Sequence, residues 1–245
     1  MSLEDILRGP QSWWKVGDLK AAWRKHPQVL YDQLNHAPDA LDPEARRQAE
    51  EIVAEWLSDP HEPYRYSAML LVDRLKMSSA IPALSRRAWQ LEVTPTEPAL
   101  RELERVRRSL ERLGPGSELP RPPETPLEGL RRQIANHCQL VYRETDTKSH
   151  GDQLLPRLGR PYERFDENER RMAEQVFSEW LLSDDHGTRV TARWIIDHCK
   201  ITAPLPQLRA LQHRLAETDI PDERVERGWV ERLITELSAL QSRLD

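Results

Sequence analysis

Four arginines recur along residues 101–112 at the spacing of one helix face, and their chemistry suits an acidic partner. They are Arg101, Arg105, Arg108 and Arg112. Guanidinium groups bind carboxylates and phosphates through paired hydrogen bonds. Glutamates stand four residues before two of these arginines, at Glu97 and Glu104, so a solvated face held by ion pairs is the alternative interpretation.

A second polar row lies upstream, and most of it recurs later in the chain. It consists of Arg65, Met69, Asp73 and Lys76, spaced i, i+4, i+8 and i+11. The same arginine, aspartate and lysine types stand again at Arg189, Asp197 and Lys200. This recurrence predicts that the three residue types have the same role in both copies. That role is either hydrogen bonding between neighbouring helical repeats or binding of a partner.

The sequence has no residue pattern typical of a metal or cofactor site. The adjacent pairs His137 with Cys138 and His198 with Cys199 would point about 100° apart on a helix, whereas zinc sites use spaced Cys and His ligands. No glycine-rich phosphate loop or nucleophile elbow is found in the sequence. We therefore predict no metal, no cofactor and no catalytic residue.

The composition narrows the function classes. The formal net charge is −5 and the sequence pI is about 6.0, which argues against a dedicated nucleic-acid binder. Two cysteines do not make a disulfide framework and favour a reducing compartment. No apolar run approaches the roughly 18–20 residues that span a bilayer, and the first residues are too acidic for a signal peptide. We expect a cytoplasmic protein with no membrane partner.

The sequence repeats itself at a shift of 124 residues. Residues 42–57 and 166–181 are identical at eight of sixteen positions, and the shift holds from 30–113 to 154–237. Residues 114–126 hold five prolines and two glycines, typical of a semi-rigid linker. The predicted division is an N-terminal helical half over 1–113, a linker over 114–126 and a C-terminal helical half over 127–245.

Apolar residues within each copy keep the period of a helix. Ala49, Ile52, Val53 and Trp56 fall at i, i+3, i+4 and i+7. Asp42 followed by Pro43 is typical of a helix start. Further helices are expected near 79–91, 96–113, 203–215 and 221–240, and no two-residue strand period is found. The sequence therefore predicts an all-α fold.

Residues 58–84 resemble a HEAT repeat. The matching residues are Asp59, Pro60, Arg65, Ala68 and Pro82 in the first copy, and Asp184, Arg189, Ala192 and Pro206 in the second. The second copy lacks the proline after the aspartate. The resemblance implies an internally duplicated α-solenoid of antiparallel helix pairs, with a concave surface lined by the second helix of each pair. It also implies protein binding more often than any other function.

The N-terminal segment QSWWKVGD has no counterpart in the second copy. Trp13 and Trp14 are either a hydrophobic cap for the first repeat or an exposed anchor for another protein. The segment also resembles the Trp-Trp-x-x-x-Asp stretch of HEAT-like alkylpurine DNA glycosylases, which implies a catalytic Asp18 and a lesion cleft formed with Trp14. In that family a long helical half precedes this stretch, and here only a short segment does.

Together these patterns predict a non-catalytic protein-binding module, such as a scaffold, an adaptor or an inhibitor of the immunity type. The predicted partner is another protein with an acidic segment. A HEAT-like DNA glycosylase or a nucleic-acid-binding subunit is the alternative. The predicted binding residues are Arg65, Met69, Lys76, Arg101, Arg105, Arg108, Trp13 and Trp14.

Overall fold

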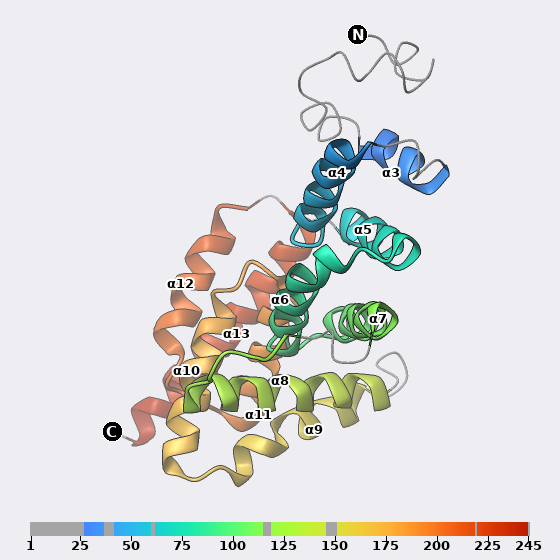
Figure 1. Cartoon of the computed structure of the whole chain (residues 1–245). Coiled ribbons are helices and arrows are strands. Elements are labelled where there is room, and N and C mark those ends of the chain that lie inside the picture. The colour runs from blue at the N-terminus through green and yellow to red at the C-terminus, as the bar shows by residue number, and fades with distance from the viewer. Residues whose placement is uncertain are drawn as a thin grey trace. The chain divides into compact units, whose positions relative to one another are not determined.

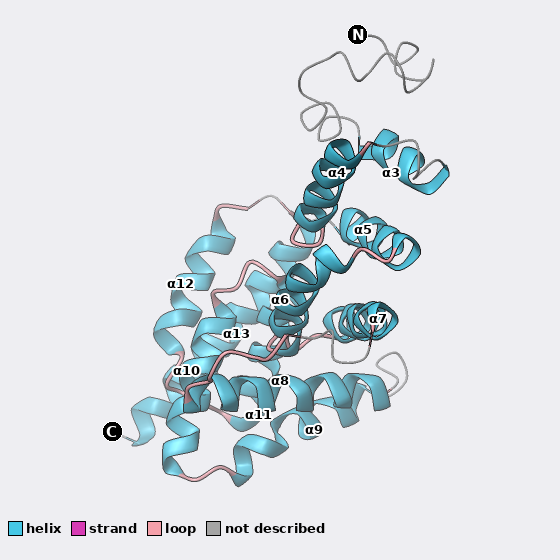
Figure 2. Ribbon diagram, viewed as in Figure 1, coloured by secondary structure: helices cyan, strands magenta, loops and turns pink. Residues whose placement is uncertain are grey.

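The protein is helical throughout the part that the structure describes. The computed structural model describes residues 27–36, 42–59, 62–114, 119–145, 151–218 and 220–244. Within these ranges every regular element is a helix (Figure 1, Figure 2), so the predicted all-α class is confirmed there. None of the helices in the same ranges combines the length and apolar character needed to cross a lipid bilayer.

The chain divides into two compact units. Unit 1 comprises Met1–Gln90 and Glu102–Arg121, and unit 2 comprises Leu91–Arg101 and Pro122–Asp245. The helices, in chain order, are α3 (Pro27–His36), α4 (Pro43–Trp56), α5 (Glu62–Leu75), the short 3-10 helix η3 (Ser78–Ala80), α6 (Ile81–Glu92), α7 (Glu97–Leu113), α8 (Pro126–Glu144), α9 (Gly151–Arg164), α10 (Glu167–Leu181), α11 (His186–Cys199), α12 (Leu205–Ala216) and α13 (Pro221–Leu244). One boundary between the units falls inside α7.

Local hydrogen bonds explain where several helices begin. The Asp42 side chain accepts a hydrogen bond from the backbone N–H of Ala45 at 2.9 Å, and Pro43 occupies the first turn. Both features satisfy or remove N–H groups that a helix start leaves unpaired. Asp166 and Glu169 form a reciprocal capping box at the start of α10. The predicted helix start at Asp42 is therefore confirmed.

The core of unit 1 uses the apolar face that the sequence predicts on α4. Ile52, Val53 and Trp56 are buried there, as are Leu71 and Val72 of α5. Burial of apolar surface is the main term that stabilises such helix packing. The buried apolar residues of α7 that belong to unit 1 are Leu103, Val106 and Leu110.

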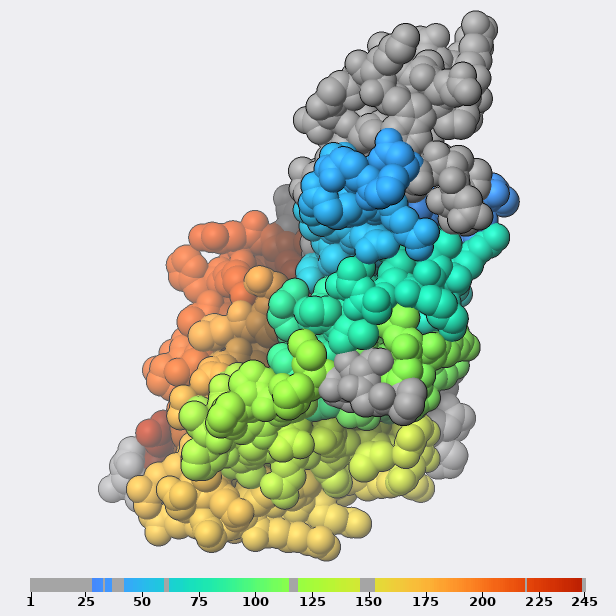
Figure 3. Space-filling model, viewed as in Figure 1, coloured from blue at the N-terminus to red at the C-terminus, as the bar shows by residue number. Residues whose placement is uncertain are grey.

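The core of unit 2 is one continuous apolar cluster. It draws on all six helices from α8 to α13 and includes Phe177 and Trp180 of α10, whose rings lie 6.0 Å apart. Helices α8 and α9 pack side by side in this unit, as their yellow-green and yellow surfaces show (Figure 3). The tilted pair of Phe177 and Trp180 stabilises the core beyond the burial of the apolar surface of the two rings.

A close approach of α9 to α11 gives a testable expectation. A Cβ at Gly159 would lie 2.6 Å from Cδ2 of His198 and 2.8 Å from Sγ of Cys199. We expect Gly159→Ala to lower the free energy of unfolding by about 1–3 kcal/mol, because an overpacked contact forces neighbours to move. Urea denaturation followed by circular dichroism measures the change.

Gly228 of α13 provides the matched control. Apart from its chain neighbours and the backbone of its own helix, no heavy atom of the described residues lies within 4 Å of a Cβ built at this position. Gly228→Ala should therefore raise the free energy of unfolding by up to about 1 kcal/mol, because alanine favours the helix more than glycine does. Equal responses of the two variants would contradict the close approach.

Candidate functional site

Arg65 lies beneath the surface and ties three segments of unit 1 together. Its side chain donates to the Glu102 carboxylate through Nε at 2.7 Å and Nη2 at 2.9 Å, and Nη1 donates to the carbonyl oxygen of Asp59 at 2.6 Å. Arg87 donates to the same carboxylate at 2.8 Å. With only 9% of its surface exposed, Arg65 fits the hydrogen-bonding alternative better than a place on a binding surface.

The carboxylate of Glu102 stays charged in this setting. Burial alone would raise its pKa, but hydrogen bonds from Arg87 and Arg65 outweigh burial, and the pKa of Glu102 lies below its ordinary value. The ion pair is therefore complete at neutral pH, and each partner compensates the desolvation of the other.

Unit 2 contains a similar ion pair at positions 124 residues later. Arg189 donates to the Glu226 carboxylate through Nε at 3.1 Å and Nη2 at 2.9 Å, and through Nη1 to the carbonyl oxygen of Asp184 at 2.9 Å. His186 also contacts this carboxylate through Nδ1 at 2.9 Å. Although burial opposes it, hydrogen bonding from Arg189 again lowers the pKa of Glu226.

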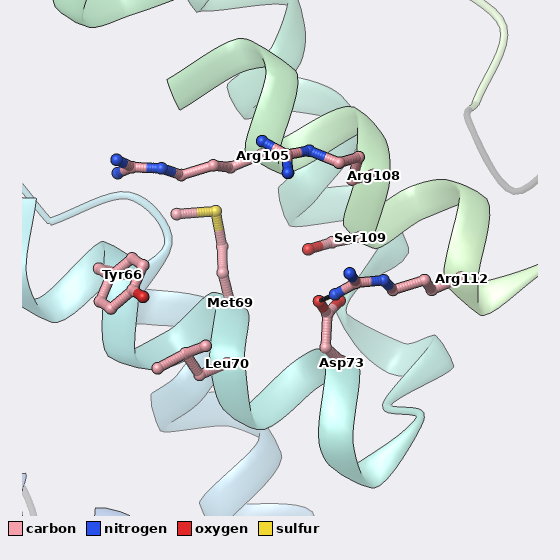
Figure 4. A pocket seen from close by; sticks show the side chains of 8 residues that line it. All are labelled: Tyr66, Met69, Leu70, Asp73, Arg105, Arg108, Ser109 and Arg112. Carbon is pink, nitrogen blue, oxygen red and sulfur yellow. Dashed lines mark hydrogen bonds and ion pairs between the residues drawn. The ribbon is translucent and has the colours of Figure 1, made fainter. Parts of the chain in front are cut away.

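An open depression on unit 1, which we call groove one, lies between α5 and α7 (Figure 4). It spans about 560 Å³, a volume that includes open solvent, and is lined by Tyr66, Met69, Leu70, Asp73, Arg105, Arg108, Ser109 and Arg112. Three of the predicted binding residues, Met69, Arg105 and Arg108, thus lie around one depression. In the close view α5 supplies the apolar side chains, and the arginines of α7 face them (Figure 4).

Two of the three arginines in groove one already have charged or aromatic partners. Arg105 lies over the Tyr66 ring at 5.4 Å, and its Nη1 is 3.5 Å from Oε1 of Glu62. Arg112 forms an ion pair with Asp73. Exposed ion pairs of this kind are weak, typically below about 1 kcal/mol, so a ligand could replace them.

Two polar groups in groove one lack a counterpart. Arg108 forms no ion pair within the described residues, and its Nε donates to the backbone carbonyl oxygen of Glu104 at 3.2 Å. The Oδ1 atom of Asp73 is buried and has no hydrogen-bond partner in the described part of the chain. Groove one therefore offers the Arg108 guanidinium to a ligand, whereas the unsatisfied Oδ1 of Asp73 lies beneath the surface of the groove.

Among the described residues, the other predicted binding residues do not line groove one. Lys76 is exposed just after α5, with its Nζ 3.4 Å from the Arg112 carbonyl oxygen, and it does not line groove one. Arg101 is exposed, forms the predicted ion pair with Glu97 and is also absent from the lining. Trp13 and Trp14, together with Asp18, lie outside the described residues.

Sequence reasoning missed the apolar wall of groove one. Tyr66 and Leu70 of α5 are 47% and 41% exposed, and neighbouring exposed apolar side chains are more informative than single ones. Their spacing of four residues puts them on one face. The signal in the sequence was the pair of Tyr66 and Leu70 on a helix face that also carries polar residues, because an aromatic residue beside an aliphatic one on such a face often marks an interface.

The histidine and cysteine pairs do not form a site with reactive thiols. Burial raises the pKa of Cys138 to about 12 and that of Cys199 to about 11, so both thiols are protonated at neutral pH. His137 donates through Nε2 to the carbonyl oxygen of Arg157 at 2.8 Å. The described residues hold no group of three or more His, Cys, Asp or Glu arranged to bind a metal ion.

Groove one is thus the feature of unit 1 that gathers several of the predicted residues. No protein-family model, curated protein or solved structure matches this chain. The chemistry of the groove itself is therefore the guide to function.

Proposed function

We propose that this chain is a non-catalytic, HEAT-like binding module that holds an acidic segment of another protein in groove one. The observation that carries the proposal is an exposed apolar wall, Tyr66 and Leu70, facing a row of arginines that includes Arg108. An apolar wall beside cations suits a segment that carries both apolar and carboxylate side chains. Scaffold, adaptor and inhibitor are the roles open to such a module.

We also propose that the two sequence copies, residues 30–113 and 154–237, descend from one duplicated helical repeat. Matched contacts support this at the 124-residue shift, beginning with the ion pairs Arg65–Glu102 and Arg189–Glu226. Lys76 and Lys200 share a φ of 52°, a left-handed conformation that is uncommon outside glycine. A shared origin explains why this local backbone feature recurs at the same shift.

A polypeptide suits groove one better than a nucleic acid does. The phosphate backbone of a nucleic acid can pair with Arg108, but it has no apolar side chain to pack on Tyr66 and Leu70. A peptide supplies both a carboxylate for Arg108 and an apolar side chain for this wall.

A double charge reversal in groove one tests the proposal. Arg105→Glu with Arg108→Glu should weaken binding to a partner isolated by affinity capture by at least about tenfold, roughly 1.4 kcal/mol. The fold should change little, because exposed ion pairs contribute about 0–1 kcal/mol. Isothermal titration calorimetry measures the affinity, and thermal unfolding checks the fold.

The control carries the same change of charge on a different helix. Arg170→Glu with Arg171→Glu reverses two exposed arginines of α10, and we expect it to leave the affinity nearly unchanged. An equal loss in both variants would show that net charge, rather than groove one, governs binding. Unchanged affinity in the Arg105 and Arg108 variant would remove groove one as the site.

Nucleic-acid binding is the second candidate, and the row Arg101, Arg105, Arg108 and Arg112 is the observation that favours it. Fluorescence polarisation with single- and double-stranded oligonucleotides over a range of salt concentrations separates the two. Binding that weakens with salt and disappears in the Arg105 and Arg108 variant would favour the nucleic-acid function. Excision of methylated purines that is lost on Asp18→Asn would instead establish the glycosylase alternative.

A further inference from the structure

Unit 2 has its own depression, groove two, whose lining differs in chemistry from that of groove one. It spans about 460 Å³, a volume that includes open solvent, between side chains of α9, α11 and α13. The lining residues are Leu155, Arg193, Trp194, Asp197, Trp229, Arg232 and Leu233. All of them belong to unit 2, so a role for groove two is independent of the function proposed for groove one.

Arg193 is the unusual member of this lining. It is only 8% exposed, and its Nη1 atom is buried with no hydrogen-bond partner in the described part of the chain. It also forms no ion pair with a described residue. Buried guanidinium groups are normally paired, because an unmet buried donor is unfavourable. Arg193 therefore has an unused capacity to bind an acceptor.

The neighbouring Arg189 shows what a satisfied arginine looks like on the same helix. One turn earlier on α11, Arg189 donates to Glu226 through two nitrogens and to the carbonyl oxygens of Ser183 and Asp184 through the third. Burial lowers the pKa of Arg193, although the negative charges of Glu226 and Asp197 partly offset it. Arg189 thus receives a full set of acceptors, and Nη1 of Arg193 receives none among the described residues.

Aromatic side chains lie beside Arg193, whose Nη1 donor is unsatisfied among the described residues. The Trp229 ring lies 5.7 Å from the Arg193 guanidinium and 4.2 Å from that of Arg232, and Trp229 is 45% exposed. A large indole left nearly half in water is typical of an anchor position at an interface. Because the Arg193 guanidinium lies over the Trp229 ring, we expect the indole to shift outward when a ligand binds Arg193.

We propose that groove two is a docking site for a protein segment that places an Asp or Glu carboxylate on Arg193 beside an apolar side chain packed on Trp229. The charges of the lining favour a carboxylate at Arg193. Asp197 is bound by Lys200 at 2.8 Å, and Arg232 lies 3.7 Å from Asp197 and 3.6 Å from Glu236. Arg193 is therefore the cation of this lining that has no ion pair among the described residues. The apolar part of the lining consists of Leu155, Leu233 and the two tryptophans. A carboxylate is the group that pairs with two nitrogens of a guanidinium.

The test uses a displayed library of short random peptides, selected on the full chain. We expect the enriched peptides to carry Asp or Glu next to a leucine, isoleucine or aromatic residue. A synthetic copy of one such peptide should bind at least about tenfold more weakly to Arg193→Met and to Trp229→Ala than to the wild type. Its amide copy, with Gln or Asn in place of the acid, should lose affinity for the wild type to a similar degree.

Two further readouts separate this site from groove one and from a structural role of Arg193. The Arg105→Glu with Arg108→Glu variant should bind the peptide as the wild type does, because those residues lie in unit 1. Arg193→Met should unfold at the same temperature as the wild type or a higher one, since it removes an unmet buried charge. A lower unfolding temperature together with unchanged peptide affinity would make Arg193 structural and overturn the proposal.

The other possible outcomes of the selection are equally decisive. A selection that yields no binders, or binders without an acidic residue, would contradict the proposed occupant. Peptides that bind Arg193→Met as well as the wild type would remove Arg193 from the site. Oligonucleotides that bind the wild type and not Arg193→Met would assign groove two to nucleic acid and overturn the proposal.

Discussion

Replacing Arg189 by leucine should lower the free energy of unfolding by about 3–5 kcal/mol, the usual effect of removing one partner from a buried ion pair. The side chains of Arg189 and Glu226 are only 3% and 1% exposed. After the substitution, His186 is the partner that Glu226 keeps, through Nδ1 at 2.9 Å. An imidazole has fewer N–H donors than a guanidinium, so it replaces an arginine incompletely. Urea denaturation measures the loss.

Arg65→Leu in unit 1 is the matched comparison. Its partner Glu102 keeps a second arginine, because Arg87 donates to it at 2.8 Å. We therefore expect a smaller loss, about 1–3 kcal/mol. Adding Glu226→Leu to Arg189→Leu should restore part of the lost stability, since the charge left unpaired is then gone. Equal losses for Arg65→Leu and Arg189→Leu would mean that Arg87 does not compensate Glu102.

Trp180→Ala should also lower the free energy of unfolding by about 3–5 kcal/mol, the range for a large aromatic removed from a core. Trp180 is buried and lies 6.0 Å from the Phe177 ring, within the continuous cluster of unit 2. The substitution removes these contacts and leaves a cavity that the close-packed helices cannot fill completely. Far-UV circular dichroism during urea denaturation follows the loss without relying on tryptophan emission.

A neighbouring residue gives the control for Trp180. Leu182 directly follows α10 and is exposed, so Leu182→Ala should change the free energy of unfolding by no more than about 0.5 kcal/mol. A loss below about 1.5 kcal/mol for Trp180→Ala would mean that the ring contributes less to the unit 2 core than its burial indicates.

Local features were readable from the sequence because they depend on residues only a few positions apart. Asp42 caps α4 through the N–H of Ala45, three residues away, and the capping preference of aspartate is enough to predict this. The i, i+4 pair of Glu97 with Arg101 forms as expected, whereas Arg108 donates to the backbone oxygen of Glu104 in place of the second expected ion pair. The burial of Ile52 and Val53 follows from their phase on one helix.

The tertiary structure alone decided which members of a polar row are surface residues. Arg65 and Lys76 share a row by spacing, yet Arg65 is buried against Glu102 while Lys76 is exposed. The acceptor for Arg65 lies 37 residues away on α7, and no local pattern brings those two residues together. Spacing predicts a shared face, but the packing of other helices against that face determines its exposure.

The two grooves could be read from the sequence only in part. By itself the sequence placed Arg105 and Arg108 on one helix face and Met69 on another, because helical period depends only on local geometry. It did not show that α5 and α7 face each other, or that Arg193 is buried with a donor left unmet. Those facts depend on which distant side chains meet in the folded chain, and only long-range packing decides that.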